Sequence, residues 1–275
     1  MHRFYVSPNE WNTAAPVLSG TEAHHARNVL RLDFGDKVVL FNGNGRELTA
    51  EIAAIDGAQI HLRKLHEATT PPLRCRITLG QAIPKGKNMD LIVQKAVEIG
   101  AAEIAPLISD RTIVHLDDET AGQKQSKWQN IAIEAAKQCG QNWLPQVRIP
   151  QKLAEFFSGA EAGESSTNPN SLPRKHSGPL DQNAFDLQLI GSLQADALHL
   201  KKILQDHIEN HGALPKNVLM LVGPEGDFTP AELALARTHG CRPITLGPII
   251  LRVETAAIYC LSILSYELLV RDQAP

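Results

Sequence analysis

Two short loops of this sequence place glycine beside residues that could hold a small molecule. The loop "GPEGDF", residues 223–228, follows the apolar run "NVLMLV" and carries the carboxylates of Glu225 and Asp227. The loop "GPIILR", residues 247–252, follows "PITL" and is apolar until Arg252. Each stands between a predicted strand and a predicted helix, where ligands of open α/β sheets bind and where glycine lets the backbone approach them. We therefore expect the two loops to form one composite ligand site.

The composition of these loops limits the chemistry of the ligand. Neither contains G-x-G-x-x-G or G-x-x-x-x-G-K-[ST], the motifs whose backbone cradles phosphates. The apolar residues 246–251 suit a neutral purine, and Glu225 and Asp227 suit a cation. S-adenosylmethionine (SAM) has an adenosine, a sulfonium and an ammonium but no phosphate, so it is one small ligand that fits. Glu225 can also be a solvated loop residue or a partner of the following helix dipole.

The helix that follows the first loop has a complete set of start signals. Thr229 can cap it, Pro230 suits its first position, and Glu232 completes a capping box. Phe228 and Leu233 stand where a hydrophobic staple would place them.

The elements that position these loops divide the chain into two parts. Residues 1–70 are β-rich: "RFYVS" predicts a first strand, and "DKVVLFNGNGRELTAEIAAIDGAQIHLRKL" predicts strands joined by Asn-Gly-Asn-Gly and Asp-Gly turns. One short helix is expected at about residues 21–30. "TTPPLR", residues 69–74, breaks the pattern and is taken as the domain boundary.

From residue 74 to 275 predicted strands and helices alternate, which indicates an α/β domain with a mainly parallel sheet. The strands expected are "ITLGQAI", "EIAPLIS", a short one near Val147, "LQLIGSL", "NVLMLV" and "PITLG". The helices expected are "NMDLIVQKAVEIG", "KQSKWQNIAIEAAKQCG", residues 153–157, and "ETAAIYCLSILSYELLV", with others after the later strands. The Ser/Gly/Pro/Asn-rich residues 158–184 predict a mobile surface loop. The last helix is apolar around much of its circumference, so it is covered either by a second subunit or wholly within its own chain.

Composition sets the broad class. The chain has 275 residues, a formal net charge of −3 and 43% apolar residues, which are ordinary values for a globular protein. Its four cysteines form no C-x-x-C pair and its eleven histidines show no metal-ligand spacing, so neither a disulfide framework nor a metal is expected. The N-terminus has no apolar signal region and no run is long enough to span a membrane, which predicts a cytoplasmic protein without a membrane partner.

Five segments in order carry a resemblance that covers nearly the whole chain apart from residues 158–184. They are "HHARNVLRLDFGDKVVLFNGNG", "GQAIPKGKNMDLIVQKAVEIGAAEIAPLISDR", "WQNIAIEAAKQCGQN", "VGPEGDFTPAEL" and "LGPIILRVETAA". Together they resemble the bacterial 16S ribosomal RNA uridine-N3 methyltransferases of the SPOUT superfamily. The resemblance implies a PUA-like β-barrel for RNA binding at residues 1–70. It also implies a SPOUT methyltransferase domain at residues 74–275, whose chain threads into a trefoil knot, and a homodimer.

The resemblance also implies the site. SAM would be the methyl donor, bent into the knot, and 16S rRNA, within the small ribosomal subunit, would be the substrate. Two stretches match the family's donor-binding loops: Val222, Gly223, Pro224, Glu225, Gly226 and Leu246, Gly247, Pro248, Leu251. Uridine N3 is nucleophilic only after it loses its proton, so the enzyme must stabilise the charge that develops, and a guanidinium near O2 or O4 would do so. Arg252 is the candidate. Glu254 is a candidate proton acceptor or, alternatively, a residue that orients Arg252 or the helix start.

Uridine N3 is hidden in a duplex, so the target must be unpaired or flipped out. Arg27 and Arg31 lie four residues apart and can face one way on the short helix. Residues 1–70 nevertheless carry seven Lys/Arg against eight Asp/Glu. Lys85, Lys87 and Arg111 are the other candidate phosphate contacts, although each can also be a solvated surface charge.

The chain departs from the family at two positions. Ile249 stands where the donor loop usually has arginine, and Gln141 where arginine usually follows Gln-Cys-Gly. Two alternatives therefore stay open. One is a non-catalytic RNA-binding or ribosome-assembly factor that keeps the fold. The other is a nucleotide-dependent enzyme, against which the acidic loop and the missing P-loop lysine argue.

Overall fold

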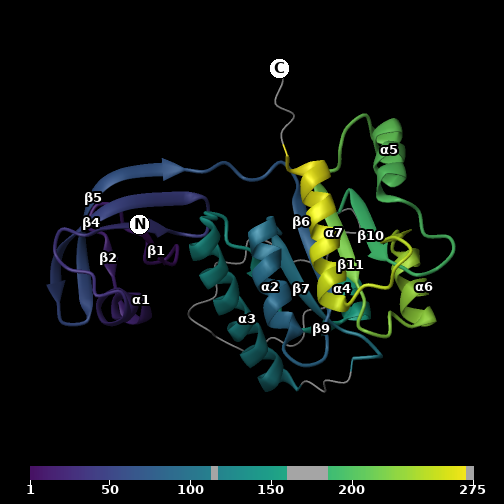
Figure 1. Cartoon of the computed structure of the whole chain (residues 1–275), viewed down its shortest axis with the longest axis horizontal. Coiled ribbons are helices and arrows are strands. Elements are labelled where there is room, and N and C mark those ends of the chain that lie inside the picture. The colour runs from purple at the N-terminus through teal and green to yellow at the C-terminus, as the bar shows by residue number, and fades with distance from the viewer. Residues whose placement is uncertain (113–116, 160–184, 271–275) are drawn as a thin grey trace. The chain divides into compact units, whose positions relative to one another are not determined.

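The computed structural model describes residues 1–112, 117–159 and 185–270, drawn in colour in Figure 1. These residues form two compact units, each described here by itself. Unit 1 comprises Met1–Pro72 and Ile133–Leu144, and unit 2 comprises Leu73–Ala132 with residues 145–159 and 185–270. Most of the predicted mobile loop, residues 160–184, lies outside the described residues.

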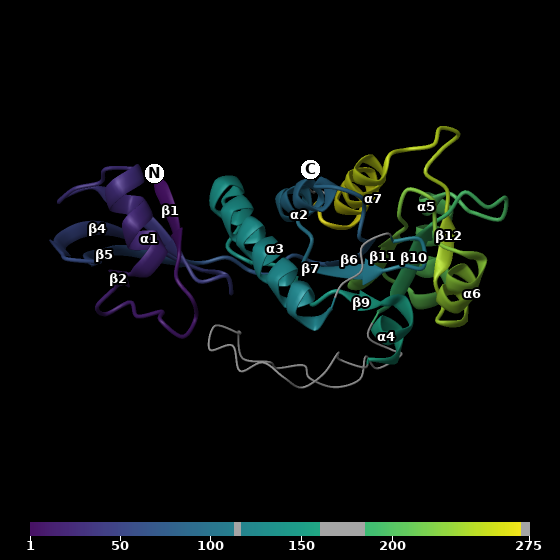
Figure 2. The same cartoon turned by 90° about the horizontal axis from the view of Figure 1, so that it is seen from below.

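Unit 1 is built on one five-stranded sheet in the order β1-β3-β4-β5-β2. Its elements are β1 (His2–Tyr5), β2 (Val17–Leu18), α1 (Gly20–His24), the π-helical turn η1 (His25–Val29), β3 (Lys37–Phe41), β4 (Arg46–Asp56) and β5 (Gln59–Thr69). β1 is parallel to β3, and the other pairs are antiparallel. Ala23 and Ala26 pack with buried strand residues in one core, and α1 lies beside the sheet in Figure 2. The β-rich character predicted for this part of the chain is confirmed.

Two local features of unit 1 bear on the sequence predictions. The Asp-Gly turn is present, with β4 and β5 joined at Gly57 in the left-handed region (φ +55°). The helical segment, however, ends before Arg31, whose φ of +56° is also left-handed. The expectation that Arg27 and Arg31 share a helical face is therefore wrong, because Arg31 lies beyond the helical segment and has a left-handed backbone.

Residues 133–144 group with unit 1 although they follow the strand β7 of unit 2 in the sequence. The Nζ atom of Lys137 lies 3.1 Å from both carboxylate oxygens of Glu22. Trp143 Nε1 donates to the Thr70 carbonyl oxygen at 2.9 Å. These residues form the end of a helix and the loop after it, so unit 1 is discontinuous in sequence.

Unit 2 contains a seven-stranded, wholly parallel sheet in the order β12-β10-β11-β6-β7-β8, with β9 also paired to β7. The strands are β6 (Arg76–Ala82), β7 (Glu103–Ile108), β8 (Gln146–Val147), β9 (Gln151–Lys152), β10 (Leu187–Gly191), β11 (Asn217–Val222) and β12 (Arg242–Ile244). The helices are α2 (Asn88–Ile99), α3 (Asp118–Cys139), α4 (Leu153–Ser158), α5 (Leu200–His211), α6 (Pro230–Thr238) and α7 (Val253–Leu268); residues 133–139 of α3 group with unit 1. The predicted α/β class with a mainly parallel sheet is confirmed.

Helices cover both faces of this sheet. α2 and α7 pack together, and α7 also contacts β6 and β11. Side chains of α4 and α6 join Leu219 and Leu221 of β11 in a buried cluster on the opposite face. Figure 2 shows α2 and α7 on one side of the sheet and α4 on the other.

The helix signals read from the sequence hold in detail. α2 buries Met89, Ile92, Val93 and Ala96 and ends at Gly100, which is left-handed (φ +97°). Thr229 and Glu232 form the reciprocal capping box of α6, and Phe228 and Leu233 are buried in one cluster. α3 begins at Asp118, six residues before the predicted start, because Asp117 Oδ1 accepts the Thr120 N–H at 2.8 Å and caps the extra turns.

Candidate functional site

The carboxyl ends of five strands meet at one edge of the parallel sheet of unit 2. The segments that leave these ends are residues 83–87, 109–112, 192–199, 223–229 and 245–252. They include every residue predicted for the ligand loops except Val222, which is the last residue of β11. β10 lies between β11 and β12, so the two Gly-Pro loops leave strands that are not neighbours, and the loop after β10 must be added to the site.

The Gly-Pro-Glu-Gly loop is tied to the loops after β6 and β7. The backbone N–H of Lys85 donates to Glu225 Oε1 at 2.9 Å, and the Arg111 guanidinium donates to the Gly226 carbonyl oxygen. The Asp110 N–H donates to Glu232 Oε1 at 2.9 Å. Glu225 is exposed, as the solvated alternative expected, but its Oε1 also has a structural partner in the Lys85 N–H.

A side chain at position 223 would crowd its own loop. Asp227 is left-handed (φ +63°), and its Oδ1 accepts the Phe228 N–H at 2.8 Å. A Cβ at Gly223 would lie 3.1 Å from both of these atoms. Gly247 differs, since its φ is +106° and a Cβ would meet nothing within 4 Å. Only the second loop therefore presents glycine backbone to open space.

A pocket of about 300 Å³ opens between the loops after β10 and β12. It is lined by Ser192, Leu193, Gln194, Thr245, Gly247, Pro248 and Ile250. This volume is at the lower end of the range for small-molecule sites. Gly247 and Pro248 were predicted, whereas the residues after β10 and Thr245 were not. Their signal would have been Gly191-Ser192 at the end of an apolar strand.

The other predicted donor-loop residues lie at the same edge without lining this pocket. Val222 and Pro224 are buried, and Leu246 and Leu251 are half-buried. Ile249 and Ile250 are 74% and 78% exposed. The loop therefore exposes apolar side chains, and Ile249 occupies the position where the family described above usually has arginine.

A buried amide lies beneath the loops. Gln81 is 0% exposed and is paired in register with Val222, the last residue of β11. Its Nε2 donates to the carbonyl oxygens of Ala82 at 2.8 Å and Val222 at 3.5 Å. Its Oε1 has no hydrogen-bond partner among the described residues. Gln81 thus joins the strand ends from which both the Lys85 and the Glu225 loops leave.

The candidate catalytic pair stands at the start of α7. Arg252 is the N-cap of that helix; its side chain is exposed and its guanidinium has no partner within the described ranges. Glu254 Oε2 accepts from Asn88 Nδ2 at 3.2 Å, so it links the first turns of α7 and α2. The structure therefore pairs Glu254 with Asn88 instead of with Arg252.

The candidate RNA contacts fall in both units. Lys85, Lys87 and Arg111 are exposed residues in the loops of unit 2. In unit 1 Arg31 is exposed, and Arg27 Nη1 donates to the Gly57 carbonyl oxygen at 2.9 Å. Arg111 also holds the Gly226 loop, which gives it a structural partner besides any phosphate.

No group of histidine, cysteine or acidic side chains in the described residues could hold a metal ion. Across the same residues, no helix is long and apolar enough to cross a membrane.

The chain is similar to proteins of known family over nearly its full length. It is 29% identical to the ribosomal RNA small subunit methyltransferase E of Bacillus subtilis, with 99% of this chain and all of that protein covered. It is 33% identical to a Legionella pneumophila protein described as a methyltransferase and solved with bound SAM, with a TM-score of 0.76 over 96% of this chain and 97% of that one.

A third relative is a ribosomal RNA small subunit methyltransferase E from Neisseria gonorrhoeae, also solved with SAM. It is 30% identical, with a TM-score of 0.76, and the match covers 97% of this chain and 98% of that one. Residues 18–65 match the RNA methyltransferase PUA domain and residues 71–265 match the RNA methyltransferase domain. The chain is therefore a member of the RNA methyltransferase domain family.

Proposed function

We propose that this protein transfers a methyl group from SAM to N3 of a uridine in 16S ribosomal RNA. The observation that carries the proposal is the likeness, over almost the whole chain, to two proteins solved with SAM, one of them named as a small-subunit rRNA methyltransferase. The family match supports the reaction class, and the resemblance described above supports the atom that is methylated.

The donor would lie at the carboxyl edge of the unit 2 sheet. The open backbone at Gly247 and the pocket between the loops after β10 and β12 offer room for it. Glu225 keeps its Oε2 without a partner in the described residues, so its charge remains able to attract a sulfonium or an ammonium. The donor loop would close the trefoil knot that the resemblance implies.

The reaction needs a bond exchange and a proton transfer. The uridine N3–H gives its proton to a base, the N3 electron pair attacks the methyl carbon, and the carbon–sulfur bond breaks to leave S-adenosylhomocysteine. Negative charge develops over O2, N3 and O4 of the base. A cation or a hydrogen-bond donor near O2 or O4 can stabilise this charge.

Arg252 can supply such a cation from an unusual placement. A cation at a helix N-terminus is electrostatically unfavourable, because that end of the helix is already partly positive. Arg252 nevertheless occupies the N-cap of the 16-residue α7 without a partner among the described residues. The helix N-terminus and the guanidinium together form a region of positive potential that would stabilise a deprotonated uracil ring.

Glu254 is the candidate proton acceptor. Its bond to Asn88 holds one carboxylate oxygen, and the other has no partner in the described part of the chain. Its location in the first turn of α7 also stabilises the helix start. Substituting Glu254 with Gln keeps the bond to Asn88 and removes the base, so it separates the two roles.

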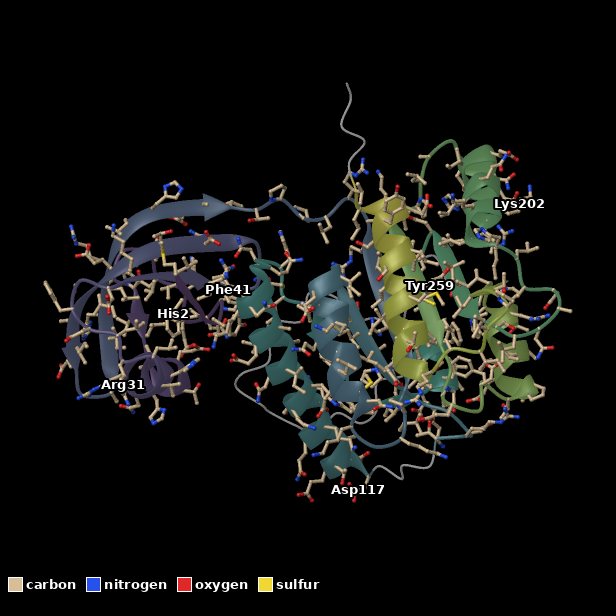
Figure 3. The ribbon with its side chains drawn as sticks, in the orientation of Figure 1. His2, Arg31, Phe41, Asp117, Lys202 and Tyr259 are labelled. Carbon is tan, nitrogen blue, oxygen red and sulfur yellow. The ribbon has the colours of Figure 1, made fainter. Side chains whose placement is uncertain are left out.

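The substrate would be an unpaired or flipped uridine within the small subunit, in the cytoplasm, and the enzyme would act as a homodimer. The dimer would cover α7, on which Tyr259 and Tyr266 are 44% and 71% exposed; Figure 3 labels Tyr259 there. Exposed aromatic side chains on a helix that already packs against a sheet are typical of a subunit interface.

One observation favours a non-catalytic RNA-binding factor as the second candidate. The exposed Ile249 and the Gln141 of unit 1 leave two positions without the cation of the resembling family. Such a factor would bind RNA and transfer no methyl group.

The test is calorimetric titration of SAM, followed by transfer of labelled methyl onto small subunits that lack the modification. Binding at one site per chain or per dimer, with label at uridine N3, is the expected result. SAM binding without transfer to any ribosomal particle would favour the non-catalytic factor.

A further inference from the structure

Two short segments leave the neighbouring strands β6 and β11 at the edge that carries the ligand loops. They are residues 82–85, Ala-Ile-Pro-Lys, and residues 222–225, Val-Gly-Pro-Glu. Each has proline at its third position, and proline has no N–H to donate to a neighbouring strand. In the described part of the chain, no backbone hydrogen bond joins the two segments beyond their first residues. The backbone ladder between the two strands therefore ends where these segments begin.

Two side-chain hydrogen bonds take the place of the ladder. At the buried end, Gln81 Nε2 donates to the Ala82 carbonyl oxygen at 2.8 Å and, over a longer distance of 3.5 Å, to that of Val222. At the exposed end, the Lys85 N–H donates to Glu225 Oε1 at 2.9 Å. The two segments and these bonds close a ring, with Gln81 at one end of it and Glu225 at the other.

The orientation of the Gln81 amide follows from its neighbours. Two carbonyl oxygens lie within reach of Nε2, so exchanging the amide nitrogen and oxygen would place oxygen against oxygen. Oε1 points elsewhere and has no partner among the described residues, although Gln81 is 0% exposed. The amide thus satisfies one carbonyl and leaves its own oxygen unpaired, so its net contribution to the stability of the fold is small. What glutamine adds over an apolar residue is the link between the two strand ends.

Gln81 lies on the face of the sheet that α2 and α7 cover. Ala82, Leu107 and Leu221 belong to the buried cluster on the opposite face, and side chains alternate along a strand. Figure 2 shows α2 and α7 together on their side of the sheet. Both helices begin at the carboxyl edge, α7 directly after Arg252. The link therefore stands at the edge that carries both the ligand loops and the candidate cation.

We propose that Gln81 is a positioning residue of the donor site, whose amide fixes the ends of β6 and β11 so that Glu225 is held in place for the cationic donor. The inference rests on the proposed function, because that function makes SAM the ligand of Glu225. A loop that is already ordered binds without spending free energy on ordering. Gln81 acts through Glu225 and not on the ligand itself, since its side chain is fully buried.

The experiment compares the full-length wild-type protein with Gln81→Leu, Gln81→Glu and Leu79→Met. Leucine removes the amide at similar size. Glutamate keeps the shape but donates to the Ala82 carbonyl only when its carboxyl is protonated. Leu79→Met is the matched control, because Leu79 is a fully buried residue of the same strand and face and the exchange conserves volume. The measurements are amide hydrogen exchange of the loops and calorimetric titration of SAM.

Gln81→Leu should speed exchange at residues 83–87 and 223–228 and weaken SAM binding, each about 2- to 10-fold, the size of one net hydrogen bond. Residues 192–199, the loop after β10, lie outside the ring and should exchange as in the wild type. Leu79→Met should match the wild type in both measurements.

Gln81→Glu gives a readout that a simple loss of packing would not move. Burial disfavours the charged form, so the pKa of the new carboxyl is raised. Its protonated form restores the donor, so the SAM affinity of the variant should be near that of the wild type at pH 5.5 and should fall about 2- to 10-fold below it by pH 8.5. Lys85, Glu225 and Glu254 are present in both proteins, so the ratio of the two affinities isolates the new carboxyl.

Separate outcomes would overturn each part of the inference. Wild-type exchange at residues 83–87 and 223–228 in Gln81→Leu would remove the link between the strand ends. If Gln81→Leu does not fold, exchange of Gln81→Glu against the wild type at pH 8.5 and 5.5 gives the same comparison. Faster exchange with unchanged SAM affinity, or an affinity ratio for Gln81→Glu that does not change with pH, would remove the positioning role. A wild-type protein that binds no SAM would refute the donor site of the proposed function, while the exchange rates would still decide whether Gln81 holds the two loops.

Discussion

Glu225 accepts the backbone N–H of Lys85 at 2.9 Å, so an acidic side chain of one strand-end loop fixes the backbone of another. The buried Gln81 amide spans the same two strand ends from below, through the carbonyl oxygens of Ala82 and Val222. The loops after β6 and β11 are therefore one connected structure. Glu225 both holds that structure and supplies a charge to the proposed donor site.

Glu225→Gln separates these two roles, since glutamine keeps the acceptor oxygen and removes the charge. We expect SAM affinity to fall about 2- to 5-fold, the effect of one exposed ion pair. S-adenosylhomocysteine lacks the sulfonium charge, so its affinity should fall less in the Glu225→Gln variant. Glu225→Ala also breaks the bond to Lys85 and should weaken both ligands. Calorimetry of both ligands checks this, and equal SAM affinity in wild type and Glu225→Gln would remove the charge from donor recognition.

Gly247→Ala tests the open loop after β12. The φ of +106° is in a region that side chains with a Cβ rarely adopt, so alanine should cost about 1–3 kcal/mol or change the loop conformation. Gly122→Ala is the control, because Gly122 lies in α3, has no left-handed φ, and its Cβ would meet nothing within 4 Å. Urea unfolding and SAM titration are the measurements. Equal effects of the two substitutions would contradict the backbone argument.

Arg252→Ala tests the proposed cation. Methyl transfer at saturating SAM should fall about 100- to 1000-fold, as for loss of one group that stabilises developing charge, while SAM affinity stays within a few-fold. Arg252→Lys should recover part of the rate. Arg237→Ala, which removes a surface arginine paired with Asp196 in the same unit, should leave transfer unchanged. If Arg252→Ala retained the full rate, Arg252 would have no part in the reaction.

The four cysteines should differ sharply in reactivity. Burial raises the pKa of the Cys75, Cys241 and Cys260 thiols to about 12, so almost none of each is thiolate near neutral pH. Cys139 is exposed. Ellman's reagent at pH 8 should modify one thiol in the native protein and four after denaturation. A Cys139→Ser variant that still reacts rapidly when native would show that a buried cysteine is accessible.

His207 should make the protein less stable in mild acid. Its pKa is lowered, first by burial and then by the neighbouring His211 and Arg242, against the opposing effect of Asp186. The unfolded state therefore binds the proton more readily than the folded state. The contribution of neutral His207 to the free energy of unfolding is complete above about pH 6.5 and is lost as the pH falls below that value. Urea unfolding at pH 7.5 and 5.5 should show a smaller difference for His207→Gln than for wild type. His66→Gln, at an exposed position of β5, should behave as wild type.

Local sequence predicted the elements whose signals are local. The capping box at Thr229 and Glu232, the left-handed end of α2 at Gly100 and the turn after Asp56 depend only on neighbouring residues. The alternation of predicted strands and helices, which indicated a parallel sheet, is likewise visible in the local sequence. The expectation that Arg31 shares a helical face with Arg27 failed at one left-handed residue. Such a residue is energetically accessible, and the neighbouring sequence gives little sign of it.

The placement of the site depended on contacts between distant residues. The order β12-β10-β11 inserted a third loop between the two Gly-Pro loops and brought Ser192 to the pocket, although the only local mark of Ser192 is the Gly191-Ser192 pair at the end of an apolar strand. The pairing of Gln81 with Val222 and of Lys85 with Glu225 joins residues about 140 positions apart. The sequence by itself determined the elements and the residue types at their ends. Only the tertiary structure decided which ends meet, because strand order and burial follow from packing over the whole chain.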